Sequence, residues 1–334
     1  MEKVALIMAG GIGSRLWPIS TQTKSKQFIN LYNNETLIQN TIKRISKVFP
    51  PENIYVVGNI NQKEELYKNL KNINKKNILL EPNQKKTACA IFYGITQIYK
   101  KHKDCIVGIF PSDHYIGDVN NFVKSLNQII ETTNDKITIL GVKPEKANPK
   151  FGYLVPNNKN KEELLSFIEK PSIHIAKKLI RKNASWSIGI YLGNIKTYIE
   201  LYKKYLNDIY TTFNTKKNIN EIYNHIEGIS FEKEIIEKHP ENFKIYTCEP
   251  KWMDVGSFEG LDKIIPKGKN KNNIDDKNTF LNSSNCTLIS TSNKKIYAIG
   301  VNDLMVIEGD DSILIVKKNM YNHIEKIKNN QNKK

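Results

Sequence analysis

The feature that most limits the fold of this chain is an alternation of short apolar runs with amphipathic stretches in its first half. The amphipathic stretches 36–46 and 120–130 place apolar residues at helical spacing. Five runs rich in Val and Ile have the pattern of strands buried on both faces: 4–8, 53–58, 77–82, 104–110 and 136–142. This alternation predicts an α/β fold, with a mostly parallel, Rossmann-like sheet covered by helices.

The second half of the chain is mixed and ends in a different pattern. Strand and helix patterns continue to about residue 250, with helices predicted at 195–206 and 230–238. Residues 266–277, PKGKNKNNIDDK, are polar and low in complexity, which predicts a linker. Four short β runs follow at about ten-residue spacing and predict a small all-β domain with a terminal helix. We therefore predict two domains, at 1–265 and 266–334.

The net charge of +17 raises the question of a nucleic-acid partner. Only Arg15, Arg44 and Arg181 are arginines, although arginine is the residue favoured for bidentate base and phosphate contacts. The lysines are spread along the chain among many asparagines. We therefore expect a solvated basic surface that attracts small polyphosphate ligands, and no nucleic-acid partner.

The location of the protein is predicted from its apolar runs and its cysteines. No run approaches the roughly 18 apolar residues of a membrane span, and the N-terminal run leads straight into a glycine-rich loop. The cysteines lie far apart, with no C-x-x-C pair and no His at metal spacing, so we expect buried, reduced thiols: Cys89, Cys105, Cys248 and Cys286. These patterns predict a cytoplasmic protein with no membrane partner.

A glycine-rich loop, AGGIGSRLWPIS, follows the first predicted strand. A dinucleotide fingerprint would need a third glycine where Leu16 stands, and an acidic residue at the end of the second strand, which reads VVGN. The Gly-Lys-Ser/Thr of a P-loop is also missing. The loop can still bring backbone N–H groups close to phosphate oxygens, and Arg15 and Lys26 add two cations. This pattern suits a triphosphate and argues against a nicotinamide-dependent oxidoreductase.

Five motifs together resemble a known family. The run AGGIGSRLWPIS…KQF resembles the signature of sugar-nucleotide pyrophosphorylases, in particular the mannose-1-phosphate guanylyltransferases (GDP-mannose pyrophosphorylases). Four further segments match in the family's order: EPNQKKTACAI (81–91), FPSDHYI (110–116), FIEKP (167–171) and WMDVGSF (252–258). The resemblance implies a nucleotidyltransferase catalytic domain at 1–265 and a small domain like a left-handed β-helix at 266–334.

The resemblance also implies a reaction and its site. GTP and mannose 1-phosphate would give GDP-mannose and pyrophosphate with Mg²⁺, for the synthesis of glycan precursors. Asp113 and Asp254 would bind the metal, and Arg15 and Lys26 would be the catalytic cations. The nucleotide would contact Ala9, Gly10, Gly11, Gly13, Ser14, Glu81, Thr87, Ala88 and Ser112. The sugar phosphate would contact Gly152, Glu169, Lys170 and Ser187.

Some of these residues also have ordinary structural explanations. Asp113 could be a turn residue or a helix cap, although the end of a parallel strand is where ligands bind in such sheets. Thr87 could be the N-cap of the helix that follows it. Gly152 could mark a strand bulge. Glu169 and Lys170 could form a surface pair before a helix.

The sequence departs from the family pattern in places that bear on the sugar. Trp186-Ser187-Ile188-Gly189 stands where Trp-Asn-Ser-Gly is usual, and Lys86-Thr87-Ala88-Cys89 stands for Asn-Thr-Ala-Pro. Ser25 replaces a Pro, and Met253 a polar residue. These changes leave two alternatives open: a nucleotidyltransferase for another hexose or heptose 1-phosphate, and a degenerate regulatory protein that binds sugar nucleotides. The C-terminal β runs are a candidate homodimer contact, but the sequence itself indicates no oligomeric state.

Overall fold

The structure is a computed structural model, which describes residues 1–11, 16–21, 25–31, 33–216, 218–275, 277–292, 294–324 and 327. The chain divides into two units. Unit 1 contains residues 1–10, 42–112 and 116–252, and unit 2 contains residues 11–41, 113–115 and 253–334. The predicted boundary at residue 265, between a catalytic domain and a small C-terminal domain, stays a prediction.

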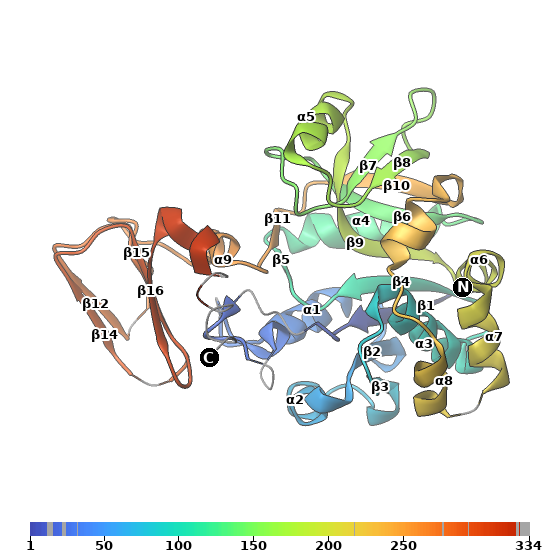
Figure 1. Cartoon of the computed structure of the whole chain (residues 1–334), viewed down its shortest axis with the longest axis horizontal. Coiled ribbons are helices and arrows are strands. Elements are labelled where there is room, and N and C mark those ends of the chain that lie inside the picture. Colours follow the sequence, from blue (N-terminus) through green and yellow to red (C-terminus); the bar gives the residue numbers. More distant parts are fainter. Residues whose placement is uncertain are drawn as a thin grey trace. The chain divides into compact units, whose positions relative to one another are not determined.

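Unit 1 contains a mixed sheet (Figure 1). Nine of the described strands belong to it. The main path has the order β10-β6-β9-β4-β1-β2-β3, and β7 and β8 lie off it. The strands are β1 Glu2–Met8, β2 Ile54–Asn59, β3 Ile78–Glu81, β4 Cys105–Pro111, β6 Ile137–Val142, β7 Tyr153–Pro156, β8 Leu164–Ile168, β9 Ser185–Asn194 and β10 Phe243–Cys248. The pairs β3-β2-β1-β4 and β6-β10 are parallel, whereas β9 runs antiparallel to β4 and β6. The predicted fold class is confirmed.

Both faces of this sheet are buried. Val4 and Leu6 of β1 pack into one apolar cluster, while the alternate residues Ala5 and Ile7 are equally inaccessible on the other face. Helices α3 and α6 pack against β1, β2, β4 and β9, and α4 packs against β9 and β10. The helices of this unit are α2 Lys63–Asn69, α3 Lys86–Lys101, α4 Val119–Glu131, α5 Ile173–Arg181, α6 Ile195–Tyr205, α7 Asn207–Thr215 and α8 Ile219–His225. The stretch predicted as a helix at 230–238 contains a π-helix, Glu232–Ile236.

Unit 2 contains most of α1 (Leu37–Ile45), parts of β5 (His114–Ile116) and β11 (Trp252–Asp254), and all of α9 (Phe258–Ile264). Its remaining strands are β12 Asn278–Leu281, β13 Thr287–Ser290, β14 Ile296–Ile299, β15 Leu304–Glu308 and β16 Ile313–Lys317. Asn278 pairs with Ile296 and Thr287 with Met305, so the chain returns in parallel after 18 residues. This repeat is β-helix-like. The predicted terminal helix contains a 3-10 helix, Lys318–His323.

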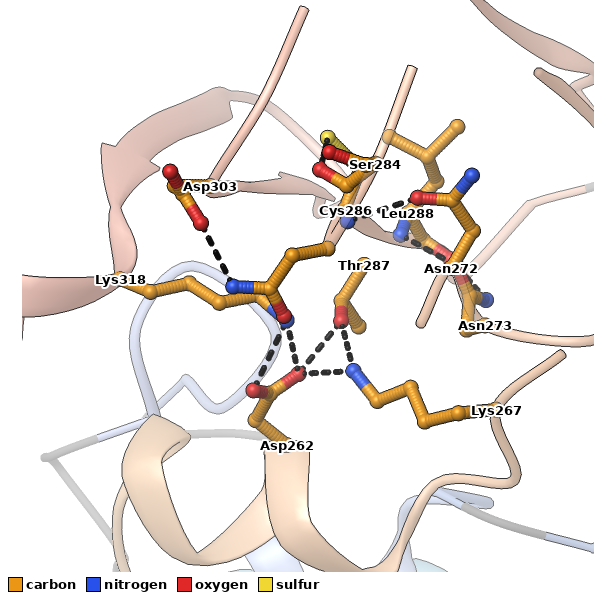
Figure 2. Close-up of polar contacts among 11 residues, drawn as sticks. Asp262, Lys267, Asn272, Asn273, Ser284, Cys286, Thr287, Leu288, Asp303 and Lys318 are labelled. Atoms are coloured by element: carbon orange, nitrogen blue, oxygen red, sulfur yellow. Dashed lines mark hydrogen bonds and ion pairs between the residues drawn. The ribbon is translucent and has the colours of Figure 1, made fainter. Parts of the chain in front are cut away.

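The predicted linker at 266–277 was wrong, because two of its asparagines are built into the β structure. Asn272 and Asn273 are buried. The side chain of Asn272 donates to the Ser283 carbonyl and accepts from the Cys286 N–H, both at 2.8 Å (Figure 2 shows the second bond). Asn273 bonds in the same way to both backbone groups of Leu288. A side-chain amide carries the same donor and acceptor as a peptide group, so these residues extend the β hydrogen bonding.

The described helices were also compared with what a membrane span requires. None of them combines enough length with enough apolar character to cross a bilayer.

Candidate active site

The ends of the parallel strands β4, β1 and β3 in unit 1 carry four of the residues predicted to bind nucleotide, and β2 lies between β1 and β3. Ala9 and Gly10 follow β1, Glu81 ends β3, and Ser112 follows β4. The Ala9 N–H donates to the Val57 carbonyl at 2.7 Å, and the Ser112 N–H donates to the Met8 carbonyl at 3.2 Å. A Cβ on Gly10 would lie 3.1 Å from Glu81 Oε2, so the glycine allows a close approach. The carboxyl edge of a parallel sheet is where ligands bind in such folds.

The Glu81 carboxyl is buried beneath this edge. Its Oε1 accepts a hydrogen bond of 2.8 Å from the hydroxyl of Tyr223. Burial raises the pKa of Glu81 to about 7, and the Tyr223 hydrogen bond offsets part of that rise. Near neutral pH this carboxyl is therefore divided between a form that only accepts hydrogen bonds and a form that can also donate one.

This pKa predicts a pH dependence of stability. Because the pKa of Glu81 is higher in the folded state, its contribution is fully present below the unfolded value of 4.5 and is lost as pH rises through about 7. The loss amounts to roughly 3 kcal/mol. We expect Glu81→Gln to remove this part of the fall in melting temperature between pH 5 and pH 8. Glu64→Gln, on an exposed side chain, is the control. Identical melting profiles for wild type and Glu81→Gln would contradict the expectation.

The first turn of α3 is fixed by segment 229–232. The Thr87 hydroxyl donates to Glu232 at 2.7 Å and accepts from the Phe231 N–H at 2.9 Å. The Ala88 N–H donates to the Ile229 carbonyl at 3.0 Å. The N-cap of α3 is Lys85, so the reading of Thr87 as the N-cap is wrong. The Thr87 hydroxyl instead binds the first turn of α3 to Phe231 and Glu232. This turn is the one predicted to lie along the nucleobase.

Sequence reasoning missed Glu232, the first residue of the π-helix. Besides Thr87, its carboxylate accepts from Tyr191 at 3.2 Å and from Ser230 at 2.7 Å. The residue that follows the π-helix, Glu237, accepts from the Glu169 N–H at 3.3 Å. The helix therefore contacts a predicted nucleotide residue at one end and a predicted sugar residue at the other. Two acids five residues apart in FEKEIIEK were the available signal, but their partners are distant in sequence.

The four predicted sugar-phosphate residues lie together in unit 1. The Ser187 N–H donates to the Gly152 carbonyl at 2.9 Å. A Cβ on Gly152 would overlap the Phe167 ring and lie 2.7 Å from Glu169 Oε2, so packing requires glycine there. Glu169 pairs with Lys170 at 2.7 Å, and the Lys170 side chain is 63% exposed. The exposed ammonium can therefore reach a ligand while Glu169 stays fixed.

Lys26 and Asp113 form an ion pair in unit 2, with side chains only 12% and 16% exposed. Burial by itself would raise the pKa of Asp113, but the Lys26 ammonium and His114 outweigh it and lower the pKa to about 2. The carboxylate is therefore ionised throughout the range in which an enzyme works. An ionised, largely shielded carboxylate is a hard oxygen ligand of the type that Mg²⁺ prefers.

Asp254 belongs to the strand next to Asp113. It ends β11, which pairs with β5, and β5 begins directly after Asp113. Asp254 Oδ1 accepts from the Gly256 N–H at 2.8 Å, which fixes the side chain. Within the described residues, no group of three or more His, Cys, Asp or Glu is placed to hold a metal ion. Two carboxylates, completed by phosphate oxygens and water, are a usual Mg²⁺ arrangement, so the donor chemistry fits.

The glycine loop is only partly described. The Gly11 carbonyl accepts from the Gln27 side chain at 3.1 Å, and a Cβ on Gly11 would meet no atom within 4 Å. Gly13, Ser14 and Arg15 lie outside the described residues. Their assignment to nucleotide binding and catalysis stays a prediction.

Comparison with known proteins finds a family model and several relatives that match this chain. A family model described as "Nucleotidyl transferase" matches residues 4–270. A mannose-1-phosphate guanylyltransferase of Salmonella muenchen is 28% identical over 347 residues, which span 97% of this chain and 72% of that protein. Mannose-1-phosphate guanylyltransferase 2 of Escherichia coli O157:H7 is 28% identical over 359 residues, with 97% of this chain and 72% of that protein covered.

A solved structure is similar over almost the whole chain. It comes from Thermus thermophilus and is described as a mannose-1-phosphate geranyltransferase. The TM-score is 0.90 and the sequence identity 25%, with 99% of this chain and 100% of that chain covered. These similarities confirm the family resemblance drawn from the five motifs.

Proposed function

The chain belongs to the nucleotidyl transferase family, and on this premise we propose that it makes GDP-mannose and pyrophosphate from GTP and mannose 1-phosphate. The observation that carries the proposal is that relatives named for this activity align with 97% of the chain. The product is a sugar carried on a good leaving group, so it suits the synthesis of glycans from activated precursors.

The charged residues have separate roles in this proposal. The family generally uses a divalent metal, and we assign Mg²⁺ to Asp113 and Asp254. When bound, Mg²⁺ neutralises charge on the triphosphate. Lys26 orients the Asp113 carboxylate through their ion pair and adds a positive charge of its own. Arg15 is assigned as the second cation. In-line attack of the sugar phosphate on the α-phosphorus needs such positioning and charge neutralisation more than it needs a protein nucleophile.

The substrates are assigned to the two sets of residues in unit 1. The strand ends at Gly10, Glu81 and Ser112 receive the nucleotide. Glu169 accepts hydrogen bonds from sugar hydroxyls, and the exposed Lys170 ammonium contacts the sugar phosphate. The pairing of these two side chains holds the carboxylate in place before the sugar arrives.

The proposal also includes the location and the assembly. A cytoplasmic location is supported by four free, buried cysteines, as expected in a reducing compartment. A homodimer contact through the C-terminal β structure is supported by large apolar side chains that are more than half exposed: Leu281, Tyr297 and Ile299.

The decisive test is pyrophosphate release with Mg²⁺, each of the four NTPs and a panel of sugar 1-phosphates. We expect the highest kcat/KM with GTP and mannose 1-phosphate. No release with any pair would contradict an enzymatic function and favour a protein that only binds sugar nucleotides. Release with another NTP and none with GTP would contradict the guanylyl assignment.

A second candidate substrate is another hexose or heptose 1-phosphate. Ser187 donates its N–H to the Gly152 carbonyl, and the next residue, Ile188, is buried, whereas the family has two polar residues at these positions. A sugar with a hydroxyl that finds no hydrogen-bond partner in the site binds less well. A sugar whose hydroxyls match the altered residues would therefore be preferred. The same panel decides, because a higher kcat/KM for another sugar 1-phosphate would replace mannose in the proposal.

A further inference from the structure

Helix α9 rests directly on the backbone of Asp254. The helix begins four residues after Asp254, and its N-cap Ser257 accepts from the Gly260 N–H at 3.3 Å. A Cβ on Gly260 would overlap the Asp254 carbonyl oxygen and would lie 3.3 Å from its carbonyl carbon. The absence of a side chain at Gly260 therefore allows this contact. Because Gly260 lies against the Asp254 carbonyl, the position of α9 and the position of the Asp254 backbone depend on each other.

The position of α9 is set by a polar network with residues 267–318, the β-helix-like segment (Figure 2). The Asp262 carboxylate accepts from Lys267 at 2.5 Å, from Lys318 at 2.9 Å and from the hydroxyl of Thr287. Lys318 follows β16, and its ammonium also donates to Asn285 at 3.2 Å. The side chains of Asp262 and Lys318 are only 18% and 12% exposed. Removing one partner from a shielded network of this kind leaves a charge without compensation, so displacement of the Asp262 side chain from its lysines is costly.

Apolar packing supports the same attachment. Val255 and Leu261 are fully buried in one cluster with Met305 and Ile307 of β15. Burial of such side chains contributes about 1.5–3 kcal/mol each, which makes α9 and the β strands one packed body. The chain from Asp254 to the end of α9 is therefore fixed by residues that lie about 40 to 60 positions further on.

We propose that α9 is a positioning element for Asp254, and that the β-helix-like segment, through Asp262 and Lys318, holds α9 where Asp254 can bind the metal–nucleotide complex. The inference rests on the proposed function, because it takes Asp254 as a metal ligand. It assigns positioning roles to Gly260, Asp262 and Lys318. Residues that orient metal ligands commonly change metal affinity by about 10–100-fold when they are replaced.

The first test is Gly260→Ala, measured by calorimetric binding of the α,β-methylene analogue of GTP in Mg²⁺ and in EDTA. The new methyl group must push the Asp254 carbonyl away. We expect affinity in Mg²⁺ to fall about 10-fold and affinity in EDTA to stay within about twofold of wild type. General damage to the fold would lower both affinities, so the ratio between them isolates the metal-dependent part.

Matched variants control for the substitutions themselves. Gly268→Ala adds a methyl group in the same unit where the nearest atom is 3.7 Å away, so it should bind as wild type does. Lys318→Met leaves the Asp262–Lys267 pair intact and should lower affinity in Mg²⁺ about threefold. Lys294→Met removes another lysine–carboxylate pair of the same unit, with Glu308 at 3.2 Å and a Lys294 side chain that is 72% exposed, and should leave the Mg²⁺-to-EDTA ratio unchanged.

The outcomes separate the inference from the proposed function. If Gly260→Ala folds and keeps the wild-type Mg²⁺-to-EDTA ratio, the inference is overturned. If Gly260→Ala does not fold, the comparison of Lys318→Met with Lys294→Met decides in the same way. A wild-type protein whose affinity for the analogue does not depend on Mg²⁺ would overturn the metal assignment, and the inference with it. A wild type that shows the dependence, with variants that do not change it, would leave the proposed function standing alone.

Discussion

Asp113→Asn is expected to lower kcat for pyrophosphate release about 1,000-fold, with the protein still folded. The amide has nearly the shape of the carboxylate but carries no charge, so it is a much weaker Mg²⁺ ligand. The low pKa of Asp113, caused by Lys26 and His114 against the effect of burial, means that the wild type always has the charged form available. Lys26 would also lose the partner of its ion pair. Steady-state kinetics at saturating substrates and a thermal melt measure the two effects separately.

Asp254→Asn should give a loss of the same order, because both carboxylates are assigned to one metal ion. Asp135→Asn, on an exposed turn, is the control and should turn over as wild type does. A loss in all three variants would indicate damage unrelated to the metal. Turnover near the wild-type value in both Asp113→Asn and Asp254→Asn would refute the metal assignment.

Much of the fold could be predicted from the sequence because the strands of a parallel sheet are buried on both faces. The apolar run 4–8 and the run 136–142, which is rich in Ile and Val, are typical of buried strands, and β1 and β6 lie where these runs predicted them. The positions of Asp113 and Ser112 followed from the same reasoning, since both come directly after the apolar run at 104–110. Local pattern and tertiary burial agreed in these segments.

The sequence failed where a side chain acts through partners far along the chain. Asn272 and Asn273 are typical loop residues by composition, yet their amides bond to backbone groups 11 to 15 residues away. Glu232 is an ordinary helical acid until the fold brings it to Thr87, 145 residues away in sequence. Gly260 shows no signal in the sequence either, although its partner is only six residues away, because its need for glycine arises from where the fold places the Asp254 carbonyl. The spacing of apolar and polar residues along the chain does not predict contacts of this kind.

Lys26→Met is expected to lower kcat about 100-fold while leaving KM for the sugar 1-phosphate within about threefold. The ammonium is fixed by Asp113 and mostly shielded from water, so its charge is only weakly screened. Charge held rigidly in such a place stabilises the transition state more than it stabilises bound substrate. The variant also leaves Asp113 buried without its partner, and a thermal melt will show how much stability is lost. Lys26→Arg keeps a positive partner for Asp113 and should recover stability, but not full kcat, since its larger planar head must place the charge elsewhere.

Lys170→Met is the matched substitution. It removes another lysine of the predicted site, but one whose side chain is exposed, whereas that of Lys26 is mostly shielded from water. The Lys170 side chain is 63% exposed, so a sugar phosphate can bind to it without displacing buried groups. Its loss should raise KM for the sugar 1-phosphate about fivefold and leave kcat within about twofold, since such a contact binds substrate and transition state alike. The two lysines are thus distinguished by which kinetic constant changes. If Lys26→Met raised KM alone, Lys26 would be a substrate-binding residue, and stabilisation of the leaving pyrophosphate would have to come from Arg15 and the metal.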